Sequence, residues 1–264
     1  MSKYLQYFKI GYQIMTTYRG QIIFGSLRHL TVVIMAVILW GTIFRGKQSV
    51  GGFDLGQIVT YYILVELIDI FYMTASARVL TRDINTGDLS NYLVKPINYW
   101  NYLLFYSYGN QLGYVSLGIV ILLVASRILP SLFFVQTNII FIIQTALLLS
   151  VSSMLYFQIF FLIGAMTFWL SDSSHFRSGV KQLIGVLGGR WAPLAFFPLW
   201  AQEILNYTPF PYLFNFVVKA YQGGLKPTEF LNLFCIELLW LGALLFVGRI
   251  VWKKGMISYA SFGK

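Results

Sequence analysis

Three charged residues, Glu66, Asp69 and Arg190, stand inside long apolar runs of this sequence, where charged side chains are unusual. A charge at the centre of a bilayer costs about 2.5 to 3.5 kcal/mol on insertion scales, so it should face protein or a wet cavity and not lipid. Carboxylates and a guanidinium at similar depth can form buried ion pairs, or they can line a polar path. Both interpretations stay open from the residues alone.

Motifs of enzymatic sites are missing or incomplete. The stretch GTIFRGKQ (residues 41–48) resembles a phosphate-binding loop, but Gln48 stands where a Ser or Thr should ligate magnesium. The sequence has no HExxH or GxSxG motif, and its two histidines, His29 and His175, are far apart along the chain. The single Cys235 allows no disulfide within the chain. We therefore expect no catalytic residue, no metal site and no cofactor.

The composition is that of a polytopic membrane protein. Hydrophobic residues make up 58% of the 264 residues and charged residues 11%, whereas soluble domains carry about 25% charged residues. The net charge of +10 could suggest a nucleic-acid partner, but the basic residues lie mainly at the ends of apolar runs. A membrane surface explains that distribution better.

The order of apolar and polar segments predicts an all-α integral membrane protein with six transmembrane helices. An amphipathic helix over residues 1–20 should lie in the plane of the inner leaflet. The spans that we predict cover residues 22–44, 55–77, 103–125, 138–170, 180–199 and 228–252. A structured polar segment is expected over residues 78–102, and a re-entrant or outer hairpin over residues 202–226.

Glycines and prolines shape the expected spans. Residues 138–170 offer no turn near their middle, so we predict one long helix there. The fifth span should be broken, because it contains several glycines followed by Pro193 and Pro198. In the third span, Gly109 and Gly113 are spaced for the close approach of another helix.

The distribution of basic residues predicts which side faces the cytoplasm. With the amino terminus inside, few of the 19 basic residues fall outside. The inner side receives Lys3, Lys9, Arg19, Arg78, Arg82, Lys95, Arg177, Lys181, Arg249, Lys253, Lys254 and Lys264. The outer side receives Arg45, Lys47, Arg127, Lys219 and Lys226, while Arg28 and Arg190 are undecided. Both termini and residues 78–102 should therefore be cytoplasmic.

Two short motifs resemble those of a known family. A Gly-x-Leu followed by Leu-x-Lys-Pro precedes the third span, and a series of prolines follows the fifth. The residues are Gly87, Leu89, Leu93, Lys95 and Pro96, then Pro193, Pro198, Pro209 and Phe210. In this order of features the chain resembles the permease subunits of type-2 ABC exporters, in their bacterial six-span subgroup. The resemblance covers nearly the whole chain.

The resemblance implies an exporter of two permeases, identical or paralogous, and two ATPase subunits in the bacterial inner membrane. ATP and magnesium would be bound by the separate ATPase. In this interpretation Arg82 to Val94 form a short coupling helix that docks on the ATPase. Asp83 and Asp88 would form ion pairs with basic residues of the ATPase, and Pro96 would end the helix. Asn98 could cap the helix that follows. The coupling residues that we assign are Arg82, Asp83, Gly87, Asp88, Leu89, Lys95 and Pro96.

The same resemblance gives the charged residues and the hairpin their expected roles. Glu66, Asp69 and Arg190 are candidates for the translocation path, and Pro198, Pro209 and Phe210 for an outer gate. The aromatic, weakly charged walls suit a hydrophobic or amphipathic cargo such as a drug, a peptide or a lipid-like molecule. A secondary transporter and a scaffold without a transport role are the alternatives, although no second half of the chain resembles the first.

Overall fold

The computed structural model describes residues 3–17, 19–73, 75–128, 133–170 and 173–262, and these residues form helices and loops with one isolated bridge between Val50 and Phe53. The all-α expectation is confirmed for this part of the chain. The longer helices are α1 (Lys3–Thr17), α2 (Arg19–Ile43), α3 (Leu55–Phe71), α4 (Ala75–Asn85), α6 (Tyr99–Ile128), α7 (Ile139–Ala165), α8 (Ser174–Leu187) and α12 (Pro227–Phe262). The shorter ones are α5 (Leu89–Leu93), α9 (Leu199–Asn206), α10 (Phe210–Leu213) and α11 (Asn215–Tyr221).

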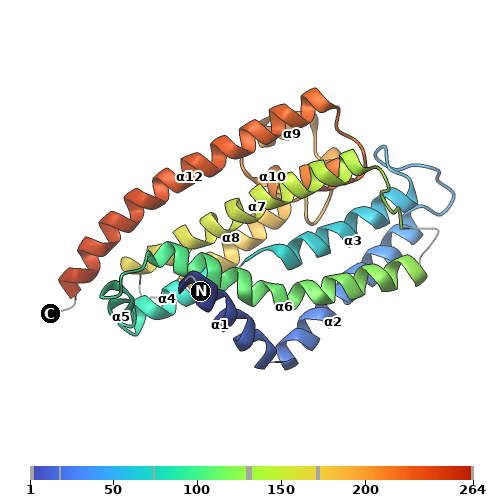
Figure 1. The fold of residues 1–264 in the computed structure, drawn as a ribbon. Helices are drawn as coiled ribbons and strands as arrows, with labels where there is room; N and C mark the ends of the chain where they lie inside the picture. Colours follow the sequence, from blue (N-terminus) through green and yellow to red (C-terminus); the bar gives the residue numbers. More distant parts are fainter. Residues whose placement is uncertain (1–2, 18, 74, 129–132, 171–172, 263–264) are drawn as a thin grey trace.

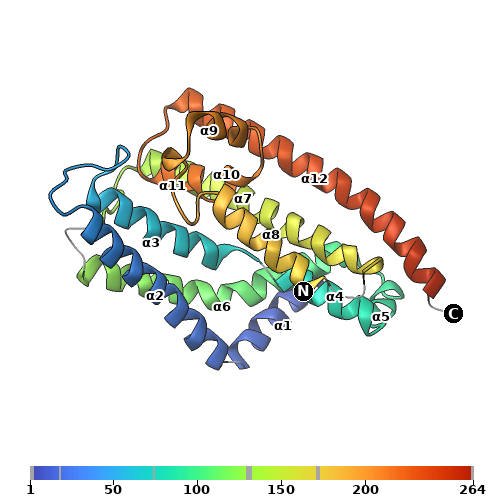
Figure 2. The ribbon, with the colours of Figure 1, turned by 180° about the vertical axis from the view of Figure 1, so that it is seen from behind.

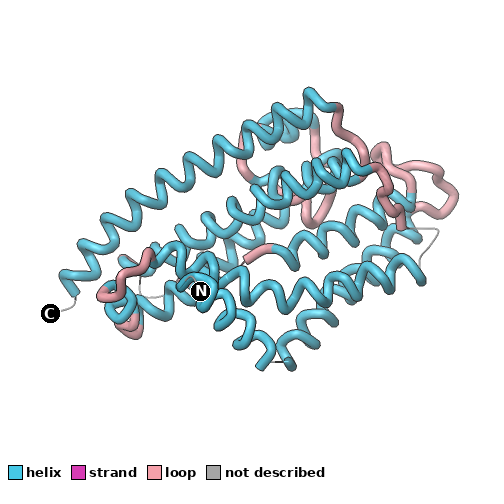
Figure 3. The backbone as a smooth tube through the Cα atoms, in the orientation of Figure 1, coloured by secondary structure: helices cyan, strands magenta, loops and turns pink. Residues whose placement is uncertain are grey.

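The long helices run side by side along one axis of an elongated bundle (Figure 1). Helix α12 forms one edge, α2 and α6 form the other, and α3, α7 and α8 lie between them, as the view from behind also shows (Figure 2). Loops gather towards the two ends (Figure 3). Helix α5 lies at one end of the bundle, and the loop between α2 and α3 lies at the other (Figure 1).

Polar residues define where several helices begin. The Asp54 carboxylate accepts a hydrogen bond from the Gln57 backbone, and the Gln57 side chain accepts one from the Asp54 backbone, which is a capping box before α3. Asn98 Oδ1 accepts a 3.1 Å hydrogen bond from the backbone N–H of Asn101, so Asn98 caps α6 as expected. Asn138 caps α7 in the same way.

Helix boundaries follow the sequence in some places and depart from it in others. Residues 139–165 form one continuous helix, as expected for residues 138–170. The expected fifth span, residues 180–199, is interrupted as predicted, because α8 ends at Leu187 and a loop follows it, but α8 begins earlier than expected, at Ser174. In the region of the expected second span, residues 55–77, α3 ends at Phe71 and α4 begins at Ala75, and the apolar stretch Leu55–Asn85 covers that whole region. Lys264, which the distribution of basic residues assigns to the inner side, lies outside the described residues.

Three helical stretches of the described residues are long and apolar enough to cross a membrane. They are Leu55–Asn85, Ile139–Phe168 and Pro227–Ala260, and a shorter apolar helix covers Leu27–Ile43. Only 6% of the most apolar 18-residue stretch of Pro227–Ala260 is buried within the chain, so α12 offers most of its apolar surface to lipid or to another protein.

Glycines bring α1 against α6. A side chain at Gly109 would collide with the backbone carbonyl of Phe8, and one at Gly11 would collide with that of Tyr106. Gly113 faces the side chain of Met15. The close approach expected from Gly109 and Gly113 is therefore real, and the helix that uses it is α1. That α1 also lies flat in the inner leaflet remains a prediction.

Candidate functional site

A cluster of charged residues lies where α2, α3 and the loop after α8 meet. Arg190 Nη2 is 3.0 Å from Glu66 Oε1 and 3.0 Å from Asp69 Oδ2, so one guanidinium bridges both carboxylates. From α2, His29 Nδ1 lies 2.5 Å from Glu66 Oε2, and Arg28 Nη2 lies 3.6 Å from Asp69 Oδ2. Glu66 and Asp69 are buried, with 2% and 7% of their surface exposed. The sequence-predicted path residues Glu66, Asp69 and Arg190 therefore come together.

The loop that carries Arg190 is held by two tyrosines of α3. The Tyr61 hydroxyl donates a 2.6 Å hydrogen bond to the carbonyl of Gly189, and the Tyr62 hydroxyl donates a 2.7 Å bond to that of Trp191. Gly189 has φ +87°, and a Cβ there would lie 2.7 Å from the Tyr61 hydroxyl. Only glycine fits this turn without strain. The turn aims Arg190 back at α3.

The charges within the cluster largely satisfy one another. Arg28 and Arg190 supply positive charge against Glu66 and Asp69, as buried carboxylates require. The His29, Glu66 and Asp69 ligand atoms lie within 4.8 Å of one another, a spacing that a metal ion could bridge. Arg190 already contacts both carboxylates, so a metal would have to displace it. The arrangement is therefore an ion-pair network.

Sequence reasoning missed the two partners on α2. It left Arg28 undecided and treated His29 as unrelated to any site. The signal was available, since a neighbouring Arg and His in an apolar helix also need partners inside the protein. Arg28 differs from the others because 51% of its side chain is exposed.

The polar segment between α3 and α6 differs from the single coupling helix expected over Arg82 to Val94. Helix α4 ends at Asn85, and α5 covers only Leu89–Leu93. Gly87 between them has φ +79°, a left-handed conformation that glycine adopts without cost. The expectation of one helix is wrong because this glycine turns the chain before α5. The end of α5 before Pro96 agrees with the sequence.

Asp83 and Leu89 do not lie on a docking surface. Asp83 is fully buried, and its carboxylate accepts hydrogen bonds from the Tyr99 hydroxyl (2.7 Å) and from Arg82 Nη2 (2.9 Å). Leu89 is also fully buried, in a cluster with Tyr99 and other residues of α4, α6 and α7. The expectation that Asp83 pairs with basic residues of a partner is wrong, because its carboxylate is buried and bonded to Arg82 and Tyr99 within the chain.

The remaining residues of the segment form an exposed surface, which we call the α5 surface. Val94 is 85% exposed and Leu93 41% exposed, so two adjacent apolar side chains face outward here. Asp88, Lys95 and Pro96 are also exposed. The ammonium of Lys95 lies 5.0 Å from the centroid of the Tyr92 ring. Of the expected coupling residues, Arg82, Gly87, Asp88, Lys95 and Pro96 are thus accessible.

The start of α1 supports the linker between α5 and α6. The Lys3 ammonium donates a hydrogen bond to the carbonyl of Pro96. The backbone N–H of Asn98 donates one to the Tyr4 hydroxyl oxygen at 3.3 Å, and this bond lowers the pKa of the half-buried Tyr4 phenol because it stabilises the phenolate. These contacts bring the amino-terminal helix to the α5 surface.

The last turns of α12 reach the same segment from the other side. The Tyr259 hydroxyl donates a 3.1 Å hydrogen bond to the carbonyl of Gly87, and it lies 3.0 Å from the Ser90 hydroxyl. Tyr99 and Trp252 stack with ring centroids 5.4 Å apart. The start of α1 and the end of α12 therefore both contact the segment that forms the α5 surface.

The expected outer hairpin consists of α9, α10 and α11. Pro198 precedes α9 and is exposed, whereas Pro209 precedes α10 and is half-buried with Phe210. A cavity of about 620 Å³ lies between these helices, α3 and the start of α12, with Tyr61, Asn206 and Glu229 among its lining residues. Nothing in this geometry assigns a gating role, which stays a prediction.

A further buried carboxyl escaped the sequence analysis. Glu237 of α12 is fully buried, and its Oε1 accepts a 2.6 Å hydrogen bond from the Ser152 hydroxyl of α7. Within the described residues, Glu237 Oε2 has no hydrogen-bond partner. The Glu237 side chain therefore fixes α12 to α7 at mid-helix.

A family described as ABC-2 family transporter protein matches residues 30–263, which is nearly the whole sequence. No curated protein sequence matches the chain.

Proposed function

Because the chain belongs to the ABC-2 family of transporter proteins, we propose that this membrane permease subunit works as half of an ATP-driven exporter. A separate subunit binds and hydrolyses ATP with magnesium, and a second permease, identical or paralogous, completes the path. The complex lies in the bacterial inner membrane, with six spans and with both termini in the cytoplasm.

The observation that carries the proposal is the α5 surface. A short helix with exposed Leu93 and Val94 beside charged Asp88 and Lys95 is suited to insertion into a groove on a soluble protein. Buried Leu89 holds this helix on the bundle, and the hydrogen bond of Tyr99 to Asp83 ties α6 to α4 beside it. A movement of the partner would therefore be passed to α4, α6 and α12.

The orientation follows from the same end of the bundle. Helix α5, the start of α1 and the end of α12 meet there, through the hydrogen bonds of Lys3 to Pro96 and of Tyr259 to Gly87. Lys253 and Lys254 add exposed basic charge to that end. Basic residues favour the cytoplasmic side of a membrane, so this end faces the cytoplasm.

The ion-pair network is the proposed part of the translocation path. Arg28, with half of its side chain exposed, links the buried Asp69 to the surface of the bundle along α2. Together with the second permease this surface can form the wall of a cavity, with Glu66 and Arg190 behind it. The cargo is a hydrophobic or amphipathic molecule, because apolar side chains such as Ile34, Met35 and Ile38 are exposed along α2.

Purification of the tagged chain from its native membrane tests the proposal. A soluble ATPase with a phosphate-binding loop should co-purify, and the preparation should hydrolyse ATP. A preparation that repeatedly contains no ATPase would overturn the exporter proposal in favour of a secondary transporter or a scaffold.

A further inference from the structure

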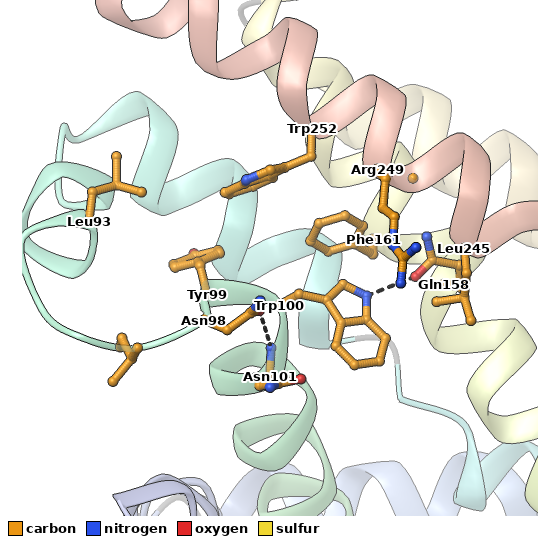
Figure 4. A pocket seen from close by; sticks show the side chains of 12 residues that line it. Leu93, Asn98, Tyr99, Trp100, Asn101, Gln158, Phe161, Leu245, Arg249 and Trp252 are labelled. Atoms are coloured by element: carbon orange, nitrogen blue, oxygen red, sulfur yellow. Dashed lines mark hydrogen bonds between the residues drawn. The ribbon is translucent and has the colours of Figure 1, made fainter.

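A cavity of about 520 Å³ lies between α12, α7 and the start of α6, next to the α5 surface. Figure 4 shows Trp252 and Arg249 projecting from α12 towards Tyr99, Trp100 and Asn101, with Leu93 on the far side of the cavity. Its volume is within the usual range of 300 to 1,000 Å³ for sites of small ligands. The path residues Glu66 and Arg190 do not line it.

The cavity favours an anion. Arg249 is the single charged residue among its lining residues, none of which is acidic. Among the residues that the structure describes, no hydrogen bond or ion pair holds the Arg249 guanidinium. The side-chain amides of Asn98 and Asn101 lie on the wall opposite α12 (Figure 4). A guanidinium with free donors and nearby amides suits a phosphate group.

The walls of the cavity are prearranged by packing. Trp100 Nε1 donates a 2.9 Å hydrogen bond to Gln158 Oε1, and Gln158 Nε2 donates one to the carbonyl of Leu244 at 3.1 Å. Trp252 stacks on Tyr99 and lies 5.7 Å from the Phe161 ring. A site whose walls are already ordered loses little entropy when a ligand binds.

The surroundings favour a lipid over a soluble ion. Phe246, Val247 and Ile250 of α12, which flank Arg249 in sequence, are exposed apolar side chains, so acyl chains can lie along this helix. Indole rings such as those of Trp100 and Trp252 prefer the membrane interface. Lys253 and Lys254 follow within two turns, and basic residues just beyond a membrane helix attract anionic lipids.

We propose that this cavity binds the phosphate headgroup of an anionic phospholipid of the inner leaflet, with Arg249 as its main contact. Leu93 at the end of α5 lines the cavity, and so do Ile97 and Asn98 of the linker between α5 and α6. A bound headgroup therefore connects α12 to the linker between α5 and α6 and stabilises the position of that linker. The orientation of this end rests on the proposed function, but the binding itself requires no transport.

Native mass spectrometry of the purified protein tests the site. The probes are phosphatidylglycerol and phosphatidylcholine with identical acyl chains. We expect wild type to retain one phosphatidylglycerol with at least about tenfold preference over phosphatidylcholine, since charge-assisted hydrogen bonds contribute on this scale. Arg249→Gln should lose that preference. The matched control is Lys254→Gln, which removes an exposed charge of the same helix outside the cavity and should keep the preference.

A second cavity variant distinguishes loss of the site from misfolding of Arg249→Gln. Leu245→Trp fills the cavity while Arg249 remains, and it should also lose phosphatidylglycerol. Retention by both cavity variants as in wild type would overturn the proposal, and so would equal loss in Lys254→Gln, because only surface charge would then matter. Displacement of the lipid by inorganic phosphate in excess would identify a site for a soluble anion and would overturn the lipid assignment.

Discussion

Arg190 and Glu66 are 124 positions apart in the sequence, yet Arg190 Nη2 lies 3.0 Å from Glu66 Oε1. The same nitrogen lies 3.0 Å from Asp69 Oδ2, one turn further along α3. The contact ties the loop after α8 to α3 inside the bundle. A residue in this position stabilises the fold whether or not it also meets a transported molecule.

Arg190→Leu should destabilise the protein by about 3 to 5 kcal/mol, because it leaves two buried carboxylates without their main partner. Thermal unfolding of the detergent-solubilised protein measures the loss. Arg28→Leu is the control, since its half-exposed guanidinium lies 3.6 Å from Asp69 and should contribute less than about 1 kcal/mol. Equal unfolding temperatures for wild type and Arg190→Leu would contradict the network.

A triple variant separates the structural and transport roles of this network. Glu66→Leu, Asp69→Leu and Arg190→Leu together remove the charges and should recover much of the stability lost in the single variant, because apolar residues can replace a buried ion pair. If the network is part of the translocation path, the triple variant folds but has lost transport. Normal transport by the folded triple variant would leave the network a structural role alone.

Gly189→Ala should be more destabilising than an ordinary glycine replacement at positive φ. A left-handed conformation costs a non-glycine residue about 1 to 2 kcal/mol. At Gly189 a Cβ also lies 2.7 Å from the Tyr61 hydroxyl, which would weaken the hydrogen bond that holds the Arg190 loop. Gly46→Ala is the matched control, because Gly46 has φ +75° and no atom near its Cβ position. Unfolding measurements that rank the two variants equally would refute the packing argument.

Asp83→Ala should destabilise the polar segment by roughly 1 to 3 kcal/mol, since the buried Tyr99 hydroxyl loses its acceptor. Asp88→Ala, on the exposed side of the Gly87 turn, should change stability by less than about 0.5 kcal/mol. Hydrogen exchange of α4 and α6 compares the two variants. Faster exchange in Asp88→Ala than in Asp83→Ala would contradict the assignment of Asp83 as the buried, hydrogen-bonded carboxylate and Asp88 as the exposed one.

The sequence predicted the class of fold and the order of its segments, because apolar length and polar breaks depend on residues close together in the chain. The long helix of residues 139–165 and the cap at Asn98 follow from such local signals. The pairing of Glu66 with Arg190 was also within reach, since a lone charge in an apolar run requires a partner.

Other features depend on contacts that no local pattern encodes. Asp83 and Asp88 look alike in sequence, but the Tyr99 hydroxyl is present at only one of them. The close packing of α1 against Gly109 could not be predicted, because the sequence does not say which helix lies beside α6. The end of α8 at Leu187 could be expected from the glycines that follow, but its start at Ser174 could not, because polar residues form its first turn.

Crosslinking from the α5 surface tests the central claim most directly. The chain has one cysteine, Cys235, so a Cys235→Ser background allows a single photo-reactive label at Val94→Cys, with Lys47→Cys in the loop at the opposite end of the bundle as the control. In native membranes we expect the label at position 94 to capture a soluble ATPase and the label at position 47 to capture none. Capture at position 47 alone, or capture of no ATPase at position 94, would contradict the account.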